Sequence, residues 1–497
     1  MGPAASAYAA LRSSARLIAR ATAAKEPRLV HRAIRGTQAA ARAVTKEDVA
    51  RFFGECVGTE DGLGAMEHLR AAAEHAPGVP DPVPPKDDDA METDEKKPAE
   101  AEKKAEDKPI ETSACLPELT VFCYVVACTI LCDAKKYDAA LPIVEAASNL
   151  AQSFNRRTLD LLGARLFKLW GLAAEKSGGS ASLAALRPKM LAHHRTCTVR
   201  HDIPGQEVLL NMLLRSYLAE RLYAQAERLR SRAPLPEDAI GARSNAQQAR
   251  YLHYLGRIRA VHLEYTEAKE CLTQALRKAP ARAAPGFRML TTKWLVVVRL
   301  LLGETPERRE LAGVAALQPY FALVAAAREG SLAAFGRVVE LHGKTYARDG
   351  LAHLVQRLRR NVIRAGVRRV ATAYSRISLV DVAAKIGLGD AAPAEVASVV
   401  AKVLRDGGEG LEGACLDAAS NCLVSRGAPP VYATRAPAAA FDERSLYLME
   451  VHNAALRAMR YPPKRGDAAE GEEARRERLA AERELADALA EDDEEEW

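Results

Sequence analysis

The sequence is poor in the residues that build metal sites, disulfide frameworks and membrane spans. Aromatic residues make up 5% of its 497 residues. Its nine cysteines include no CxxC pair and its 11 histidines form no His-x-His or HExxH motif, which excludes the common zinc modules. The uncharged run at residues 120–132 is shorter than the ~20 residues that cross a bilayer. We expect buried, reduced thiols at Cys123, Cys128 and Cys132, no cofactor and no membrane span.

Three short motifs suggest chemistry but lack the rest of their pattern. Gly343-Lys-Thr345 resembles a phosphate-binding loop, yet Val338 stands where the first glycine is needed. His193 and His194 lie near Cys197 without the spacing of a zinc site, so we expect them to be surface histidines. No nucleophile elbow or complete dinucleotide fingerprint is present either. The sequence therefore predicts a protein without catalytic, cofactor or metal residues.

What the chain has in abundance is alanine, leucine and arginine. Its hydrophobic fraction is 48%, rich in residues that lose little side-chain freedom in a helix, so an α-helical protein is expected. The net charge of +6 is uneven, because residues 471–497 contain 12 acids and four arginines and leave +14 for the rest. A basic surface suits acidic partners, protein or nucleic acid, or is simply solvated.

A recurring Tyr-x-x-Ala pattern predicts helical repeats. It begins at Tyr137, Tyr223 and Tyr265, and the spacings correspond to a period of about 40 residues with one degenerate copy between the first two. Each tyrosine should begin the second helix of a pair, as in an α-solenoid. In the clearest copy, residues 249–282 match a tetratricopeptide-like unit, in which Gly256 and Ala268 allow two helices to approach closely.

The pattern of helix signals changes between residues 377 and 425. Ser378 with Asp381 forms a capping box for a short helix that ends at Gly387, and Pro393 begins a second helix that closes near Gly407. Two short segments, residues 411–416 and 421–424, can then pair as a hairpin. This order of elements predicts a winged helix.

The expected organisation is all-α dominated, with the following boundaries. The segments are an N-terminal helical or flexible region, 1–75; a disordered charged linker, 76–113; the repeat solenoid, 114–350; the winged-helix module, 351–430; a C-terminal bundle helix, 431–462; and an acidic tail, disordered or helical, 463–497. Residues 1–25 contain arginine and serine without an acid, which is also typical of transit peptides.

Three sets of residues are candidate contact surfaces. An arginine stripe that suits an acidic partner, or is only solvated, comprises Arg357, Arg360, Arg364 and Arg368, opposite an apolar face of Leu351, Val355, Leu358 and Val362. Two apolar seams on the C-terminal helix, which partner helices or its own winged helix would bury, comprise Leu446, Leu448, Met449, Val451, Ala455, Leu456 and Met459. The candidate edge of the wing comprises Leu411, Leu416, Leu423 and Val424. The second helix of the winged-helix module has only two basic residues, Lys402 and Arg405, so nucleic-acid binding is not expected.

Several stretches resemble one known family, that of the non-ATPase regulatory subunit 3 of the 26S proteasome, a lid component with a PCI domain. These stretches are Tyr254-Leu-Gly-Arg-Ile-Arg-Ala260, Ala275-Leu-Arg-Lys-Ala-Pro280, Leu300-Leu-Leu-Gly-Glu304, Tyr374-Ser-Arg-Ile-Ser-Leu379 and Ala458-Met-Arg-Tyr-Pro462. The resemblance covers roughly residues 25–465. It implies that the winged helix is the PCI module and that the repeats serve as a scaffold.

The resemblance also implies a function and partners. The chain would be a non-catalytic lid subunit in the cytoplasm and nucleus, a hetero-oligomer with other lid and base subunits, including PCI subunits and a small acidic lid subunit. Alternatives are a PCI subunit of the COP9 signalosome or of a translation-initiation complex, or a winged-helix nucleic-acid binder. Gly407, Gly408, Gly410 and Gly413 crowd the expected first wing strand and weaken its pairing, which moves the expected interface towards the C-terminal helix.

Overall fold

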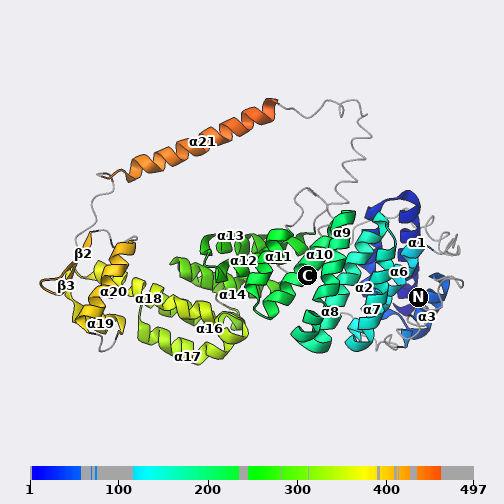
Figure 1. Ribbon diagram of the computed structural model, residues 1–497, viewed down its shortest axis with the longest axis horizontal. Coiled ribbons are helices and arrows are strands. Elements are labelled where there is room, and N and C mark those ends of the chain that lie inside the picture. The colour runs from blue at the N-terminus through cyan, green and yellow to red at the C-terminus, as the bar shows by residue number, and fades with distance from the viewer. Residues whose placement is uncertain are drawn as a thin grey trace, which may run out of the picture. The chain divides into compact units, whose positions relative to one another are not determined.

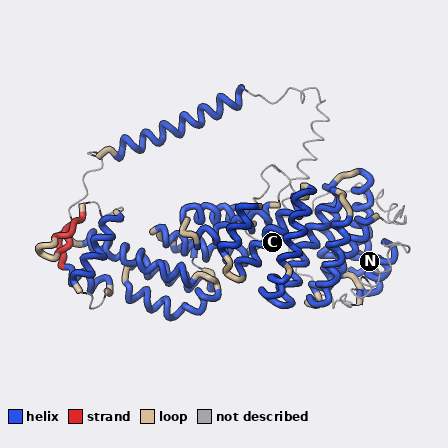
Figure 2. The backbone as a smooth tube through the Cα atoms, viewed as in Figure 1, coloured by secondary structure: helices blue, strands red, loops and turns tan. Residues whose placement is uncertain are grey.

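The computed structural model describes residues 3–56, 69, 73–74, 116–233, 244–280, 283–311, 313–388, 392–407, 411, 413–425, 432 and 434–460, most of them in helices (Figures 1 and 2). The expected linker at 76–113 and tail at 463–497 lie outside these residues. Among the described residues, no helix has the length and hydropathy required to cross a membrane. The expectation of an all-α dominated fold with helical repeats, a winged helix and a C-terminal helix is confirmed.

The chain forms two compact units whose boundary in sequence falls between Tyr254 and Leu255, within one helix. Among the described residues, the helices before this boundary are α1 (Pro3–Ala24), α2 (Pro27–Ala43), α3 (Lys46–Cys56), α6 (Pro117–Asp133), α7 (Tyr137–Ser153), α8 (Asp160–Ala185), α9 (Arg187–Arg200), α10 (Ile203–Ala219) and α11 (Tyr223–Arg232), with a 3-10 turn at Arg157–Leu159. Helix α12 (Asn245–Val261) contains the boundary. After it come α13 (Tyr265–Lys278), α14 (Pro285–Leu302), α15 (Arg308–Leu311), a 3-10 turn at Ala315–Leu317, α16 (Gln318–Glu329), α17 (Leu332–Arg348) and α18 (Ala352–Ala373).

The first unit is built around α6, which is apolar on every side. A helix of this kind must be covered all round, and α1, α2, α3, α7 and α8 all contact it. Cys123 and Cys128 are fully buried in it, and Cys132 is nearly so, which confirms their expected role in packing. Burial raises the pKa of the Cys132 thiol to about 11, so this sulfur stays protonated and unreactive at neutral pH. Leu11 and Ile18 bring α1 into the same core.

The repeat signal in the sequence marks real helix starts. Helices α7, α11 and α13 begin at Tyr137, Tyr223 and Tyr265, as expected. Two residues before each tyrosine the backbone takes a left-handed conformation, at Lys135, Arg221 and Leu263. A residue with positive φ ends the preceding helix and reverses the chain, so each pair shares one turn geometry. The copy between the first two pairs, α8 and α9, departs from the period, because α8 has a kink at Gly179 and α9 begins at Arg187.

Close packing in the best repeat depends on a glycine. A Cβ atom added at Gly256 would lie 2.7 Å from Leu272 Cγ and 3.3 Å from the carbonyl oxygen of Ala268. Both Ala268 and Leu272 are fully buried, so α12 and α13 approach closely at Gly256 and Ala268, as the sequence predicted, and Leu272 packs against the glycine. The core then continues through α14, α16 and α18, with Trp294, Tyr320 and other buried side chains between them.

Candidate assembly interface

The second unit continues into a winged-helix module that uses α18 as its first helix. After α18 follow β1 (Arg376–Ser378), α19 (Leu379–Ile386), α20 (Pro393–Asp406), β2 (Ala414–Asp417) and β3 (Cys422–Ser425). They enclose a small core of their own to which α18, α19, α20 and β3 all contribute, with Val367, Val382, Val400 and Leu423 among its members. The predicted helices from Ser378 to Gly387 and from Pro393 to Gly407 are confirmed.

The first short helix of the module begins and ends as its sequence dictates. Asp381 N–H donates to Ser378 Oγ over 3.2 Å, and Ser378 Oγ–H donates to the Asp381 carboxylate over 2.7 Å. The first of these bonds satisfies an N-terminal backbone donor that the helix itself cannot pair, and the second joins the two side chains. Gly387, with φ of 80°, ends the helix in the left-handed conformation. The same Ser378 closes β1, so one residue joins the sheet to the helix.

The three strands form an antiparallel sheet in the order β1-β3-β2, with Leu416 opposite Leu423 and Ile377 opposite Leu423 on its other side. This order corrects the expected wing edge. Leu423 and Val424 belong to the middle strand, and Leu411 and Leu423 are buried in the module core, so of the four candidates only Leu416 lies on an edge strand. Strand β1 has only three residues, and the sequence pattern did not predict it.

The glycines near the wing have a different role from the one expected. Strand β2 begins at Ala414, after Gly413, whose φ is 83°. Gly407, with φ of 63°, follows the last residue of α20. Both conformations favour glycine, so these residues shape the connection between α20 and β2 rather than interrupt a strand. Gly408 and Gly410 lie outside the described residues. The expectation that glycines weaken β2 itself was therefore wrong for Gly413 and Gly407.

The arginine stripe runs along α18, opposite the expected apolar face, whose four residues are all buried. Two of the arginines have partners in the same module: Arg360 pairs with Asp406, and Arg364 donates to the carbonyl oxygen of Gly407. The hydrogen bond from Arg360 lowers the pKa of the Asp406 carboxyl. The stripe thus holds the end of α20 against α18, a contact that sequence reasoning missed. The side chain of Arg360 is still 74% exposed, and Arg357 is exposed as well.

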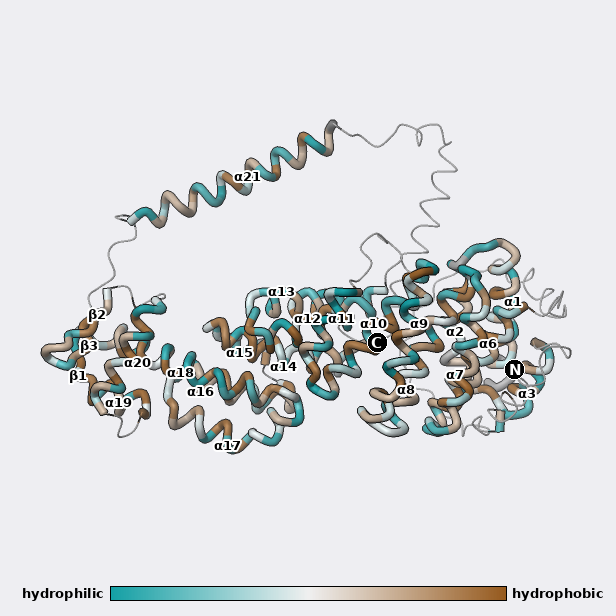
Figure 3. The backbone as a smooth tube through the Cα atoms, viewed as in Figure 1, coloured by the Kyte–Doolittle hydropathy of each residue, from teal (hydrophilic) through white to brown (hydrophobic). Residues whose placement is uncertain are grey.

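The C-terminal helix α21 (Ala436–Arg460) covers the predicted span and carries large apolar side chains that face solvent. All seven seam residues are exposed, from 41% for Leu456 to 76% for Met459 among the larger ones. Figure 3 shows hydrophobic and hydrophilic segments alternating along the whole length of α21. Phe441 and Tyr447 add to this surface. Large apolar side chains exposed in this number are typical of a site of protein association.

The remaining sequence candidates fall in structural positions. Gly343 lies in the interior of α17, so no phosphate-binding loop exists at Gly343-Lys-Thr345. His193 is not the surface residue expected: its ring centroid lies 5.6 Å from that of Phe167 and 5.4 Å from that of Trp170, and burial lowers its pKa. Within the described residues, no group of three or more His, Cys, Asp or Glu side chains is arranged to hold a metal ion.

Comparison with known proteins matches three regions of the chain. The family model "PSMD3-like, N-terminal TPR repeats" matches residues 3–324, and "PCI domain" matches residues 340–408. A third model, for the C-terminal region of the proteasome regulatory subunit, matches residues 430–496. The chain belongs to the family of the 26S proteasome non-ATPase regulatory subunit 3.

Individual relatives in this family are similar over most of their length. A probable 26S proteasome non-ATPase regulatory subunit 3 of Nicotiana tabacum is 41% identical over 91% of this chain and 87% of its own. Homolog A of the same subunit in Arabidopsis thaliana is 46% identical over 70% of each chain. The probable Drosophila melanogaster subunit is 41% identical over 78% of this chain and 77% of its own. The winged helix is therefore a PCI module, and α21 lies in the segment that the proteasome C-terminal model matches.

Proposed function

We propose that this chain is a non-catalytic structural subunit of the regulatory particle lid of the 26S proteasome, and that it supports degradation of ubiquitylated proteins by holding other subunits in place. Its relatives carry the name of such a subunit over most of this chain. The observation that carries the proposal within the structure is α21, a 25-residue helix whose apolar seams face solvent. A helix that exposes this much apolar surface gains stability when partner helices cover it.

Three surfaces then contact three different kinds of partner in the assembly. The seams of α21 enter a helical bundle with other subunits. The outer edge of β2, which lies opposite β3 in the sheet, offers unpaired backbone groups to another PCI module. Arg357 and the exposed Arg360 on α18 suit an acidic partner such as a small acidic lid subunit. In this arrangement the repeats before residue 350 act as a spacer, and the region after residue 350 provides the contacts with other subunits.

Two further features support a role without catalysis and without nucleic acid. The motif that most resembled a nucleotide site lies inside a continuous helix. On α20, the helix that would enter a DNA groove, Arg405 contacts Asp406 at 3.5 Å. One of the two basic residues of this helix is therefore paired with an acidic residue of the same helix. The proposed cellular location is the cytoplasm and nucleus, where reduced cysteines such as those in α6 persist.

Affinity isolation of the tagged full-length chain from its own cells tests this function. Mass spectrometry should recover the ATPases and the other lid subunits of the proteasome regulatory particle in near-equal amounts. Recovery of COP9 signalosome or translation-initiation subunits in their place would contradict the proposal. The isolated chain should leave ubiquitin chains intact in a cleavage assay that uses a known deubiquitinase as its positive control. Cleavage by the purified chain would contradict the non-catalytic part.

A further inference from the structure

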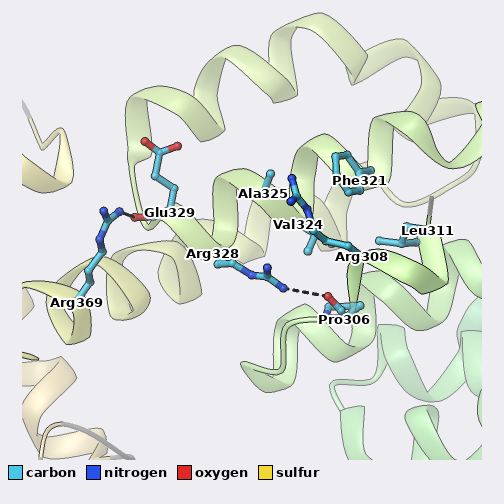
Figure 4. Close-up of a pocket in the computed structure, with 9 residues that line it drawn as sticks. All are labelled: Pro306, Arg308, Leu311, Phe321, Val324, Ala325, Arg328, Glu329 and Arg369. Carbon is cyan, nitrogen blue, oxygen red and sulfur yellow. Dashed lines mark hydrogen bonds between the residues drawn. The ribbon is translucent and has the colours of Figure 1, made fainter. Parts of the chain in front are cut away.

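An open groove of about 430 Å³ lies between α15, α16 and α18 in the second unit (Figure 4). Its apolar residues offer a ligand little surface, because Leu311 and Val324 are buried and Arg308 covers the ring of Phe321, 5.7 Å from its centroid. The exposed members of the lining are mostly charged instead. The groove is therefore a polar site, and none of the contact surfaces proposed above includes it.

Three of the charged residues are arginines, one from each of the three helices. Arg328 donates to the carbonyl oxygen of Pro306 over 3.2 Å, and Arg369 donates to the backbone carbonyl oxygen of Glu329 over 3.1 Å. Arg308 is held by the aromatic ring beneath it. Each guanidinium is thus positioned by a neutral group, which does not cancel its charge. Because a guanidinium has five N–H donors, each arginine retains donors for a ligand.

No carboxylate neutralises these arginines within the described part of the chain. None of the three forms an ion pair with another described residue. Glu329 also lines the groove, but Figure 4 shows its side chain directed away from Arg328. In the same unit Arg360, by contrast, pairs with Asp406. Positive charge therefore accumulates in the groove, and the ligand that complements it is an anion.

The groove suits a compact polyphosphate better than an acidic peptide. Peptide grooves normally offer apolar pockets for successive side chains or a free strand edge, and this groove has little apolar surface. Its volume lies in the range of small-molecule sites, ~300–1,000 Å³. All three cations are arginines, whose forked guanidinium groups can bind two phosphate oxygens at once. We propose that the groove binds a small polyphosphorylated molecule, whose phosphate groups contact Arg308, Arg328 and Arg369.

Binding at this place has a structural consequence. A molecule held by all three arginines joins α15 and α16 to α18, the helix that the repeats share with the PCI module. The ligand binds the folded unit and not the unfolded chain, so it raises the stability of this unit as its concentration exceeds the dissociation constant. The unfolding temperature of the second unit therefore depends on the concentration of the ligand.

Calorimetry and hydrogen exchange on the purified full-length chain test the proposal, with inositol hexakisphosphate as the probe. One molecule should bind per chain at about 0.15 M salt. It should slow exchange in peptides that cover residues 306–311, 321–329 and 366–372, and myo-inositol, which lacks phosphates, should not. Absence of binding, or protection confined to other parts of the chain, would overturn the proposal. Tighter binding of a deca-glutamate peptide at the same residues would show that the ligand class is wrong.

Three double variants separate this site from general attraction to a basic protein. Arg308→Ala with Arg328→Ala should weaken binding about tenfold or more, because charge-assisted hydrogen bonds are lost. Lysine at the same two positions keeps the charge but not the fork, and should give an intermediate affinity.

Arg337→Ala with Arg359→Ala is the matched control, since it removes the same charge at exposed positions outside the groove. This variant should bind the probe like the wild type. Equal affinities of the groove variant and the control would overturn the proposal. The exchange map of the wild type needs no variant, so it decides the question even if a substitution destabilises the unit.

Discussion

Gly330 and Gly366 contact each other backbone to backbone where the last repeat helices meet the winged-helix module. A Cβ atom at Gly366 would lie 2.5 Å from the Gly330 carbonyl oxygen, and one at Gly330 would lie 2.5 Å from Gly366 N. Gly330 ends α16 with φ of 70°, and Gly366 lies in the middle of α18, beside Ile386 of α19. The two glycines let α16, α18 and α19 approach at one point, so the repeats and the module share α18.

Substitution of Gly366 should loosen this contact. Gly366→Ala places a methyl group against backbone that cannot move aside, and we expect a loss of about 1–3 kcal/mol, typical of overpacking. The measurement is urea denaturation read by hydrogen exchange of peptides from α16 and α18. Gly343→Ala, at a helical position where nothing lies within 4 Å of the added carbon, is the control and should gain up to ~1 kcal/mol. Equal stability of the two variants would contradict the steric argument.

A buried ion pair holds three helices of the same unit together. Lys293 Nζ lies 2.8 Å from Asp349 Oδ2, the Tyr320 hydroxyl donates to the same oxygen over 2.8 Å, and the charged side chains are each 9% exposed. Asp349→Ala leaves a buried ammonium group without its partner and should cost about 3–5 kcal/mol. Tyr320→Phe removes one hydrogen bond and should cost about 1 kcal/mol. Urea denaturation of the two variants and the wild type measures both losses of stability. A larger loss for Tyr320→Phe than for Asp349→Ala would contradict the role given to the ion pair.

Stability of the first unit should fall as pH rises through the acidic range. Burial, with Asp202 nearby, raises the pKa of the Asp160 carboxyl from 3.8 to about 7, although Arg157 opposes the shift. The folded protein therefore binds this proton more tightly than the unfolded chain. The corresponding stabilisation is complete below pH ~4 and is lost as pH rises to ~7.

Asp160→Asn should remove this part of the pH dependence. Thermal unfolding between pH 4 and pH 8, read by hydrogen exchange of α8 peptides, should give a flatter profile for the variant than for the wild type. The variant should also be the more stable protein at pH 8. Asp442→Asn, on exposed α21, is the control and should follow the wild-type profile. If the wild-type unit became more stable relative to Asp160→Asn as the pH rose from 4 to 7, the predicted direction of the pH dependence would be wrong.

Local patterns account for the parts of this structure that the sequence predicted. The starts of α7, α11 and α13, the cap at Ser378 and the span of α21 depend on residues within a few positions of each other. The contacts that were missed join distant residues: Lys293 with Asp349, Arg364 with Gly407, and Gly330 with Gly366. They arise only when helices have packed, and no single-sequence pattern marks them.

The candidate interface shows the same division. The seams of α21 follow from helical periodicity alone, and all their residues are exposed. The edge of the wing can be assigned only when the strand order is known, and this order depends on β1. Strand β1 has three residues, the last of which caps a helix, so the sequence gives almost no sign of a strand there. The arginine stripe was predicted as a continuous surface, but α20 brings Asp406 and Gly407 to two of its members.

The central claim is that the apolar seams of α21 carry this subunit into the proteasome. Cells depleted of the endogenous chain should be complemented with the full-length protein, with Leu448→Asp/Val451→Asp, or with Asn453→Asp as the control on the same helix. Native gels with peptidase staining measure assembled 26S particles. Wild type and control should restore them, and the double variant should incorporate about tenfold less or worse, because a buried, unpaired charge costs more than ~1.4 kcal/mol. Incorporation of the double variant at the wild-type level would contradict the account.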